Sequence, residues 1–155
     1  MKHKLILALT LAGVAAATSV QAAGPEDLIK HRQSGYDFMA WNMGKIKSQV
    51  IDNPASFNKE QVIAAANVIA AIANSGMGAL YAPGTETGTG WKPTRTKADF
   101  FQKPEEVKKV ALAFNKEANE LAKVAASGDI DAIRAQFGKV GETCKSCHDS
   151  FRTKE

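Results

Sequence analysis

The two cysteines of the chain are separated by two residues and are followed directly by a histidine. They form the pentapeptide Cys144-Lys145-Ser146-Cys147-His148 near the carboxyl end. A Cys-x-x-Cys-His run is the attachment motif of c-type haem, in which both thiols add to the haem vinyl groups and the adjacent imidazole coordinates the iron. The motif predicts one covalently attached haem c, held by Cys144 and Cys147, with His148 as an iron ligand.

Two other uses of the motif stay open from the residues alone. A redox-active Cys-x-x-Cys pair is typical of a strand that leads into a helix, and a structural zinc site needs two further ligands. The sequence around Cys144 predicts neither context. A haem-free thiol oxidoreductase is therefore the alternative from another functional class.

The first 22 residues have the three parts of a cleavable secretory signal. The basic start 1–4 precedes an apolar run over 5–17, and small residues lead to a cleavage site after Ala22. The apolar run is shorter than the roughly 20 residues that span a bilayer. We expect a signal peptide over 1–22 and a haem-binding domain over 23–155, which is periplasmic and has no membrane attachment once the signal is removed. The alternative is an uncleaved N-terminal anchor.

Composition excludes several functional classes. A chain of 155 residues with 45% hydrophobic residues is the size of one globular domain. Without Lys2 and Lys4 of the signal, 18 basic residues stand against 16 acidic ones and are spread along the chain, so we expect no nucleic-acid binding. The sequence offers no Ser-His-Asp set or phosphate-binding glycine loop, so we expect no enzyme that turns over an organic substrate.

Apolar residues recur every three or four positions in four segments, which is typical of amphipathic helices. The pattern predicts helices from Pro25 to a stop at 52–54, from Asn58 to a stop at 74–76, from Pro104 to a stop at 127–128, and from Asp129 through Phe151. Glycines and prolines between Met77 and Lys103 predict a long crossover loop. Two short connections and one long one predict an all-α fold, an antiparallel four-helix bundle whose crossover joins the second and third helices.

These features resemble the class II c-type cytochromes, and within them the cytochrome c prime family. The segments that carry the resemblance are 25–27, 30–34, 83–86, 127–129 and 144–152. The resemblance implies a haem protein that binds small gases, such as nitric oxide and carbon monoxide, or exchanges electrons with an unidentified redox partner.

Three polar residues are expected near the haem. Arg32 lies in the apolar stripe of the first helix, where a charge is costly unless it is paired. The resemblance implies that Arg32 and Gln33 contact the haem, with a propionate as the partner of Arg32. Thr96 is a further candidate for a propionate contact. The alternative for Arg32 is a side chain that extends to water from the end of the bundle.

The sixth iron position decides between two kinds of haem protein. Low-spin relatives place a methionine four residues after this arginine, where the present chain has Tyr36. We therefore expect five-coordinate, largely high-spin iron. The alternative is a low-spin electron carrier with Met39 as the sixth ligand, although a methionine at this spacing is more often part of the core.

Arg152, four residues after His148, is expected either to influence the proximal side of the haem or to interact with the end of the helix.

Apolar residues also cover more of the first two helices than one stripe. The second helix is apolar on nearly every side from Val62 to Ala73, and the first carries Phe38, Trp41 and Met43 around its main stripe. Exposed patches of this kind usually mark an interface. We expect a homodimer formed through these two helices.

Overall fold

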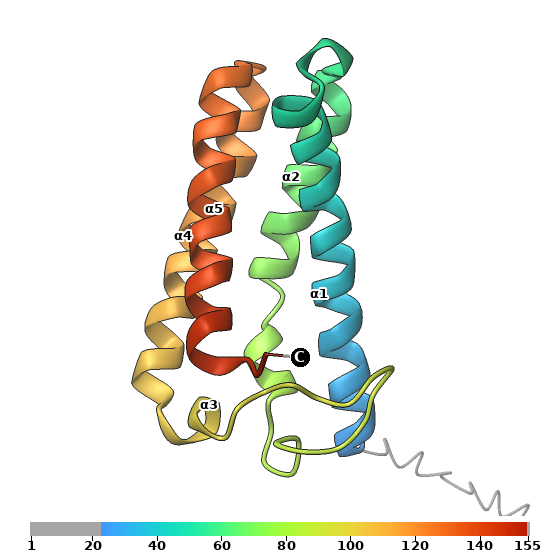
Figure 1. Cartoon of the computed structure of the whole chain (residues 1–155), viewed down its shortest axis with the longest axis vertical. Helices are drawn as coiled ribbons and strands as arrows, with labels where there is room; N and C mark the ends of the chain where they lie inside the picture. Colours follow the sequence, from blue (N-terminus) through green and yellow to red (C-terminus); the bar gives the residue numbers. More distant parts are fainter. Residues whose placement is uncertain (1–22, 155) are drawn as a thin grey trace, which may run out of the picture.

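The computed structural model describes residues 23–154 and consists of four long helices packed side by side (Figure 1). The long helices are α1 (Pro25–Lys47), α2 (Lys59–Ala73), α4 (Pro104–Ser127) and α5 (Ile130–Phe151). Short elements are a π-helical turn over Ser48–Asp52, 3-10 turns over Pro54–Ser56 and Met77–Leu80, and the single-turn helix α3 (Asp99–Gln102). The four-helix bundle is confirmed, and its long crossover follows α2 as expected. The expected signal, 1–22, lies outside the described residues.

The ends of α1 follow from its sequence. Pro25 suits a first helical turn because its missing N–H needs no partner there, and Glu26 and Asp27 complement the positive end of the helix dipole. Lys45 and Lys47 complement the opposite end. The helix then widens into the π-helical turn, which stops before Pro54. The first helical segment therefore ends close to the predicted stop.

The core lies between the four long helices. Small alanines at 65, 66, 118 and 125 are buried, so the backbones of α2 and α4 can approach closely. Larger side chains fill the remaining space, namely Ile46, Ile69, Leu121, Ile133 and Val140, all 0% exposed. Val62 is also buried, so it belongs to the core of one chain and not to an outer surface. We expected α2 to carry more apolar surface than one protomer can bury. For Val62 this expectation is wrong, because the small alanines leave room for its side chain inside the bundle.

The turn between α4 and α5 reverses the chain and aims α5 at the crossover end. Gly128 ends α4 with a φ of +78°, which other residues rarely adopt. Asp129 then caps α5, because its carboxylate accepts hydrogen bonds from the backbone N–H groups of Asp131 and Ala132. The Cys144 to His148 motif consequently lies in the last turns of α5, next to the crossover.

The crossover segment, residues 77–103, is attached to both α1 and the end of α5. Gly90 lies so close to α1 that an added Cβ would come within 2.7 Å of the backbone nitrogen of Lys30. At the other side the segment pairs with the C-terminal residues: the backbone N–H of Lys97 donates to the carbonyl of Phe151, and that of Thr153 donates to the carbonyl of Arg95. Figure 1 shows this segment running across the lower end of the bundle, between α1 and the end of α5.

Helix packing is uneven around the bundle. The α1/α2, α2/α4 and α4/α5 pairs pack along their lengths, whereas α1 and α5 make only sparse contact. Within residues 23–154, none of the helices has the length and apolar character needed to cross a membrane. The α1/α5 seam is thus the place where side chains from two long helices face each other without close helix packing.

Candidate functional site

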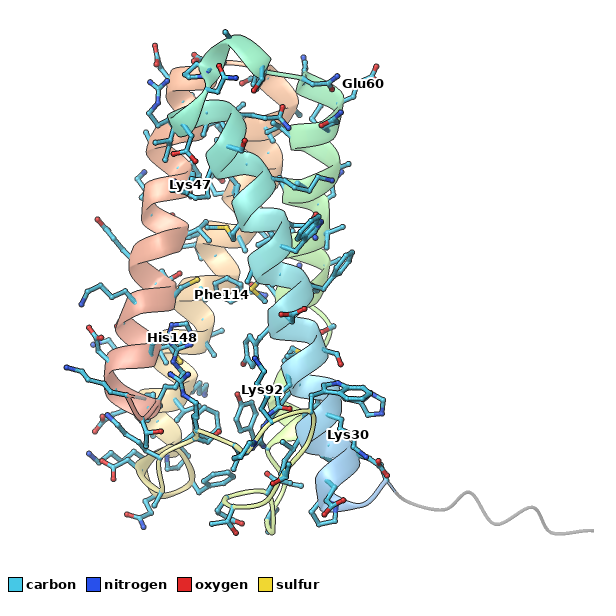
Figure 2. All side chains as sticks on the ribbon, turned by 45° about the vertical axis from the view of Figure 1, so that its right-hand side comes forward. Lys30, Lys47, Glu60, Lys92, Phe114 and His148 are labelled. Atoms are coloured by element: carbon cyan, nitrogen blue, oxygen red, sulfur yellow. The ribbon has the colours of Figure 1, made fainter. Side chains whose placement is uncertain are left out.

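The three motif side chains share one face of α5. Cys144, Cys147 and His148 occupy positions i, i+3 and i+4 of a continuous helix, which places them next to one another on its surface. Both cysteines are half-buried free thiols, and His148 is exposed. Figure 2 places His148 on the lower part of α5, toward the end where Lys30 of α1 and Lys92 of the crossover also lie.

Tyr36 of α1 faces this motif across the seam. Desolvation raises the pKa of the Tyr36 phenol, a hydrogen bond from Tyr81 lowers it, and negative charge on Cys147 or Cys144 would raise it. The phenol therefore stands within electrostatic reach of both thiols. That Tyr36 and the two cysteines lie on opposite sides of one haem stays a prediction.

Burial acts on both thiols of the motif. Burial raises the pKa of Cys144 and of Cys147, and the charge of Cys147 raises that of Cys144 further. A redox-active pair requires the opposite, a cysteine whose pKa is lowered. No cluster of three His, Cys, Asp or Glu side chains suited to a metal ion occurs within residues 23–154.

His148 is kept in the form that binds metals. Desolvation lowers its pKa, and the positive charges of Arg152 and Arg95 lower it further. A lowered pKa favours the neutral imidazole, whose nitrogen lone pair is available to a metal. The electrostatics around His148 therefore suit an iron ligand.

Arg32 is buried, and the crossover segment satisfies its terminal N–H groups. One terminal nitrogen donates to the carbonyl of Leu80 and the hydroxyl of Thr85, at 3.1 and 2.8 Å. The other donates to the carbonyl of Thr85 and the hydroxyl of Thr94, at 2.8 and 2.7 Å. With 2% exposure the side chain does not extend to water. Its partners here are loop oxygens, and its contact with a propionate stays a prediction.

Gln33 and Thr96 also hold the crossover segment. The Gln33 side-chain carbonyl accepts from the backbone N–H groups of Trp91 and Lys92, and its amide donates to the carbonyl of Lys92. The Thr96 hydroxyl lies 3.2 Å from that of Thr94, and its backbone bridges Arg152. Their predicted haem contacts remain predictions.

The rival ligand Met39 lies in the core. It is 6% exposed and packs in the buried cluster that includes Ile46 and Leu121. This environment matches a core methionine.

Arg152 is the C-cap of α5. Its backbone N–H donates to the carbonyl of His148 at 3.0 Å, while its own backbone is extended, with φ −118° and ψ 133°, and pairs with Thr96 of the crossover. Its charge lowers the pKa of His148, and its predicted influence on the proximal side of the haem stays a prediction.

An aromatic cluster at this end was not predicted. The Tyr81 ring stacks on Phe100 with centroids 4.1 Å apart, and Phe100 meets Phe151 edge-on at 5.7 Å. The guanidinium carbon of Arg32 lies 4.4 Å from the Tyr81 ring centroid. Tyr81 lies in a loop, so helical periodicity could not predict its position in this cluster. The sequence shows only that an aromatic residue stands among glycines and prolines.

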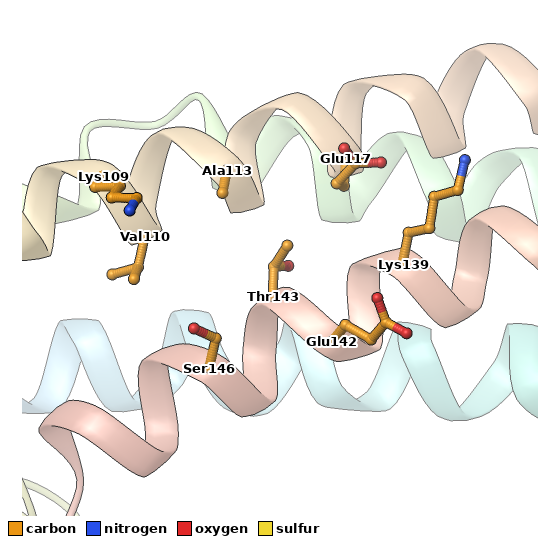
Figure 3. Close-up of a pocket in the computed structure, with 8 residues that line it drawn as sticks. All are labelled: Lys109, Val110, Ala113, Glu117, Lys139, Glu142, Thr143 and Ser146. Carbon is orange, nitrogen blue, oxygen red and sulfur yellow. The ribbon is translucent and has the colours of Figure 1, made fainter.

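A separate hollow between α4 and α5 does not include the motif. It measures about 490 Å³. Figure 3 shows its lining residues: Lys109, Val110, Ala113, Glu117, Lys139, Glu142, Thr143 and Ser146. Cys144, Cys147 and His148 are absent from this lining, so the hollow is distinct from the candidate site.

The residues at the α1/α5 seam fit a c-type haem. Two free thiols and a neutral imidazole supply the attachment and ligation chemistry on one side. On the α1 side the hydroxyls of Tyr36 and Tyr81 are hydrogen-bonded to each other, and those of Thr94 and Thr96 lie 3.2 Å apart.

Comparisons with known proteins agree with this donor set. The family model described as Cytochrome C' matches residues 27–152. Cytochrome c' of Rhodocyclus tenuis is 62% identical over 87% of this chain and 100% of the relative, and that of Allochromatium vinosum is 54% identical over 99% and 100%.

Solved structures agree as well. A cytochrome c' described as having an unusual ligand-controlled dimer dissociation superposes with a TM-score of 0.82, at 54% identity over 86% of this chain and 100% of that one. A nitric oxide complex of a cytochrome c prime variant from Alcaligenes xylosoxidans gives 0.75, at 32% identity over 87% and 100%. Together with the motif on α5, these matches show that the chain belongs to the cytochrome c' family and that its cofactor is a covalently attached haem c.

Proposed function

We propose that this haem protein is periplasmic, that its iron is five-coordinate and high-spin, and that it binds small gases, transfers electrons or does both. The observation that carries the proposal is the placement of Tyr36 on α1 opposite the two thiols of α5. A phenol replaces the methionine of low-spin relatives at this position, and a neutral phenol is a poor iron ligand. Desolvation raises the pKa of Tyr36 and so favours that neutral form.

The chain's own residues have separate roles in this proposal. Cys144 and Cys147 form the thioethers, and His148 is the proximal ligand. A haem held there supplies an iron that changes between the ferric and ferrous states and accepts a small ligand. Tyr36 covers the opposite side, and Met39 stays in the core, where its burial supports a packing role.

Gas binding draws support from a relative. The cytochrome c prime variant from Alcaligenes xylosoxidans was solved as a nitric oxide complex. We extend nitric oxide and carbon monoxide binding to this chain and expect no catalytic turnover of an organic substrate. The redox partner is unidentified. A periplasmic location follows from the proposed signal over 1–22.

A homodimer through α1 and α2 is part of the proposal. Phe38 and Trp41 of α1 are 54% and 67% exposed, whereas Met43 packs against the core. Exposed aromatic side chains on one helix are typical of an interface. A relative of similar structure is described as a dimer whose dissociation is controlled by ligand, which supports a dimer here.

Haem attachment is tested by acid–acetone extraction of protein made with the haem-attachment machinery. The wild type should keep its haem, and a variant with Cys144→Ala and Cys147→Ala should release it. His148→Ala should keep covalent haem but lose normal iron ligation in its absorption spectrum. Retention of haem by the double cysteine variant would contradict the attachment.

A further inference from the structure

The two tyrosines of the chain are hydrogen-bonded to each other. The Tyr81 hydroxyl donates to the Tyr36 hydroxyl at 3.2 Å, and the residues are 45 positions apart in the sequence. Tyr36 belongs to α1 and Tyr81 to the start of the crossover segment. The bond therefore fixes a side chain of the haem site to a loop outside the four helices.

Tyr81 is held firmly on the loop side. Its ring stacks on Phe100 with centroids 4.1 Å apart and receives the guanidinium of Arg32 at 4.4 Å. Arg32 is itself fixed by its hydrogen bonds to Thr85 and Thr94. A side chain with these contacts has little freedom to follow a neighbour that moves.

Tyr36 is held less firmly. It is 42% exposed, and its hydroxyl accepts the hydrogen bond from Tyr81. A ligand that enters on the Tyr36 side of the haem has to move this phenol aside. Because Tyr81 cannot follow, the Tyr36–Tyr81 hydrogen bond has to break.

We infer that Tyr81 is a positioning residue that holds Tyr36 across the ligand-binding side and thereby lowers the affinity for gases. The inference rests on the proposed function, in which a gas binds on the side that Tyr36 covers. It assigns a role in ligand binding to a residue of the crossover loop. Arg32 acts in the same arrangement through Tyr81, in addition to tying the loop to α1.

The first test is an equilibrium titration of the ferrous protein with carbon monoxide. Tyr81→Phe keeps the ring for Phe100 and Arg32 and removes only the hydroxyl. It should tighten carbon monoxide binding about three- to tenfold, the effect of one neutral hydrogen bond that no longer has to break. In a Tyr36→Phe background the same substitution should change nothing, because the acceptor is already missing. Unchanged affinity in Tyr81→Phe, or an equal gain in both backgrounds, would overturn the role.

A matched control breaks another bond between the same two segments. The Trp91 indole N–H donates to the Ser34 hydroxyl at 2.8 Å, which also links the crossover to α1. Trp91→Phe should leave carbon monoxide affinity unchanged. A gain equal to that of Tyr81→Phe would mean that general loosening of the loop, and not the tyrosine pair, sets the affinity.

The second readout follows the tyrosines themselves by ultraviolet resonance Raman spectroscopy. With only two tyrosines in the chain, each single Tyr→Phe variant leaves one tyrosine signal. Carbon monoxide should shift the tyrosine C–O stretching bands of the wild type but leave the Tyr81 band of Tyr36→Phe in place. Wild-type bands that do not respond to bound carbon monoxide would overturn the inference alone, whereas a ferrous protein that binds no carbon monoxide would overturn the gas-binding part of the proposed function as well.

Discussion

At the scale of single residues, Arg32 couples the first helix to the crossover. Its terminal nitrogens donate to oxygens of Leu80, Thr85 and Thr94, and Thr85 is fully buried. Removal of a donor from such a site leaves buried oxygens without partners, which costs more than the hydrogen bonds contribute when formed. These hydrogen bonds of Arg32 therefore stabilise the end of the bundle at which the crossover meets α1.

We predict that Arg32→Leu lowers the free energy of unfolding by about 2–4 kcal/mol, the cost of several unpaired buried oxygens. Denaturant unfolding followed by circular dichroism measures it. Lys30→Leu, which removes only an exposed ion pair with Asp27 on the same helix, should stay within about 0.5 kcal/mol of the wild type. Equal losses in both variants would count against the role of Arg32.

At the scale of elements, the path of the crossover depends on its closest approach to α1. An added Cβ at Gly90 would meet the Gln33 side-chain oxygen at 2.6 Å, the Lys30 backbone nitrogen at 2.7 Å and the Ile29 side chain at 2.9 Å. Backbone of a helix cannot yield as a flexible side chain does. The closest approach of the loop to the α1 backbone therefore requires glycine at position 90.

Gly90→Ala should lower the free energy of unfolding by about 1–3 kcal/mol, because the loop has to move away from α1. Gly138→Ala is the matched control. It lies inside α5 with open space around it, so alanine should stabilise the helix by about 0.5–1 kcal/mol. Thermal unfolding of the two variants should show shifts of opposite sign, and a stable Gly90→Ala protein would contradict the close approach.

The helices could be predicted from the sequence, whereas the contacts of the crossover loop could not. Periodicity locates four helices because each hides a continuous apolar stripe, and the motif spacing places Cys144, Cys147 and His148 on one face. Capping residues such as Asp129 predict where a helix begins. The partners of Arg32 and the contacts of Tyr81 could not be predicted, since they depend on how an aperiodic loop folds over residues distant in sequence.

At the scale of the whole molecule, the exposed aromatic side chains of α1 mark a surface for assembly. Phe38 and Trp41 lie on one helix, whereas Leu112 of α4 is a similarly exposed apolar residue elsewhere, at 60%. The buried position of Val62 makes it unsuitable for testing an interface, since a charge there would disrupt the core.

We predict that the wild type is a dimer at micromolar concentration and that Trp41→Glu shifts it toward the monomer. A buried carboxylate without a partner disfavours association. Light scattering behind size-exclusion chromatography gives the mass, and Leu112→Glu should leave it unchanged. A monomeric wild type, or a Trp41→Glu protein that stays dimeric, would rule out this interface.

The ferric absorption spectrum tests the central claim most directly, namely that a covalent haem lies between His148 and a tyrosine that does not ligate iron. The wild type should show a high-spin, five-coordinate spectrum, with a charge-transfer band at the red end of the visible range. Tyr36→Met should move it toward six-coordinate low spin by supplying a thioether ligand. A low-spin wild-type spectrum, or a Tyr36→Met variant that stays high-spin while Met39→Ala alters the spectrum, would contradict the account.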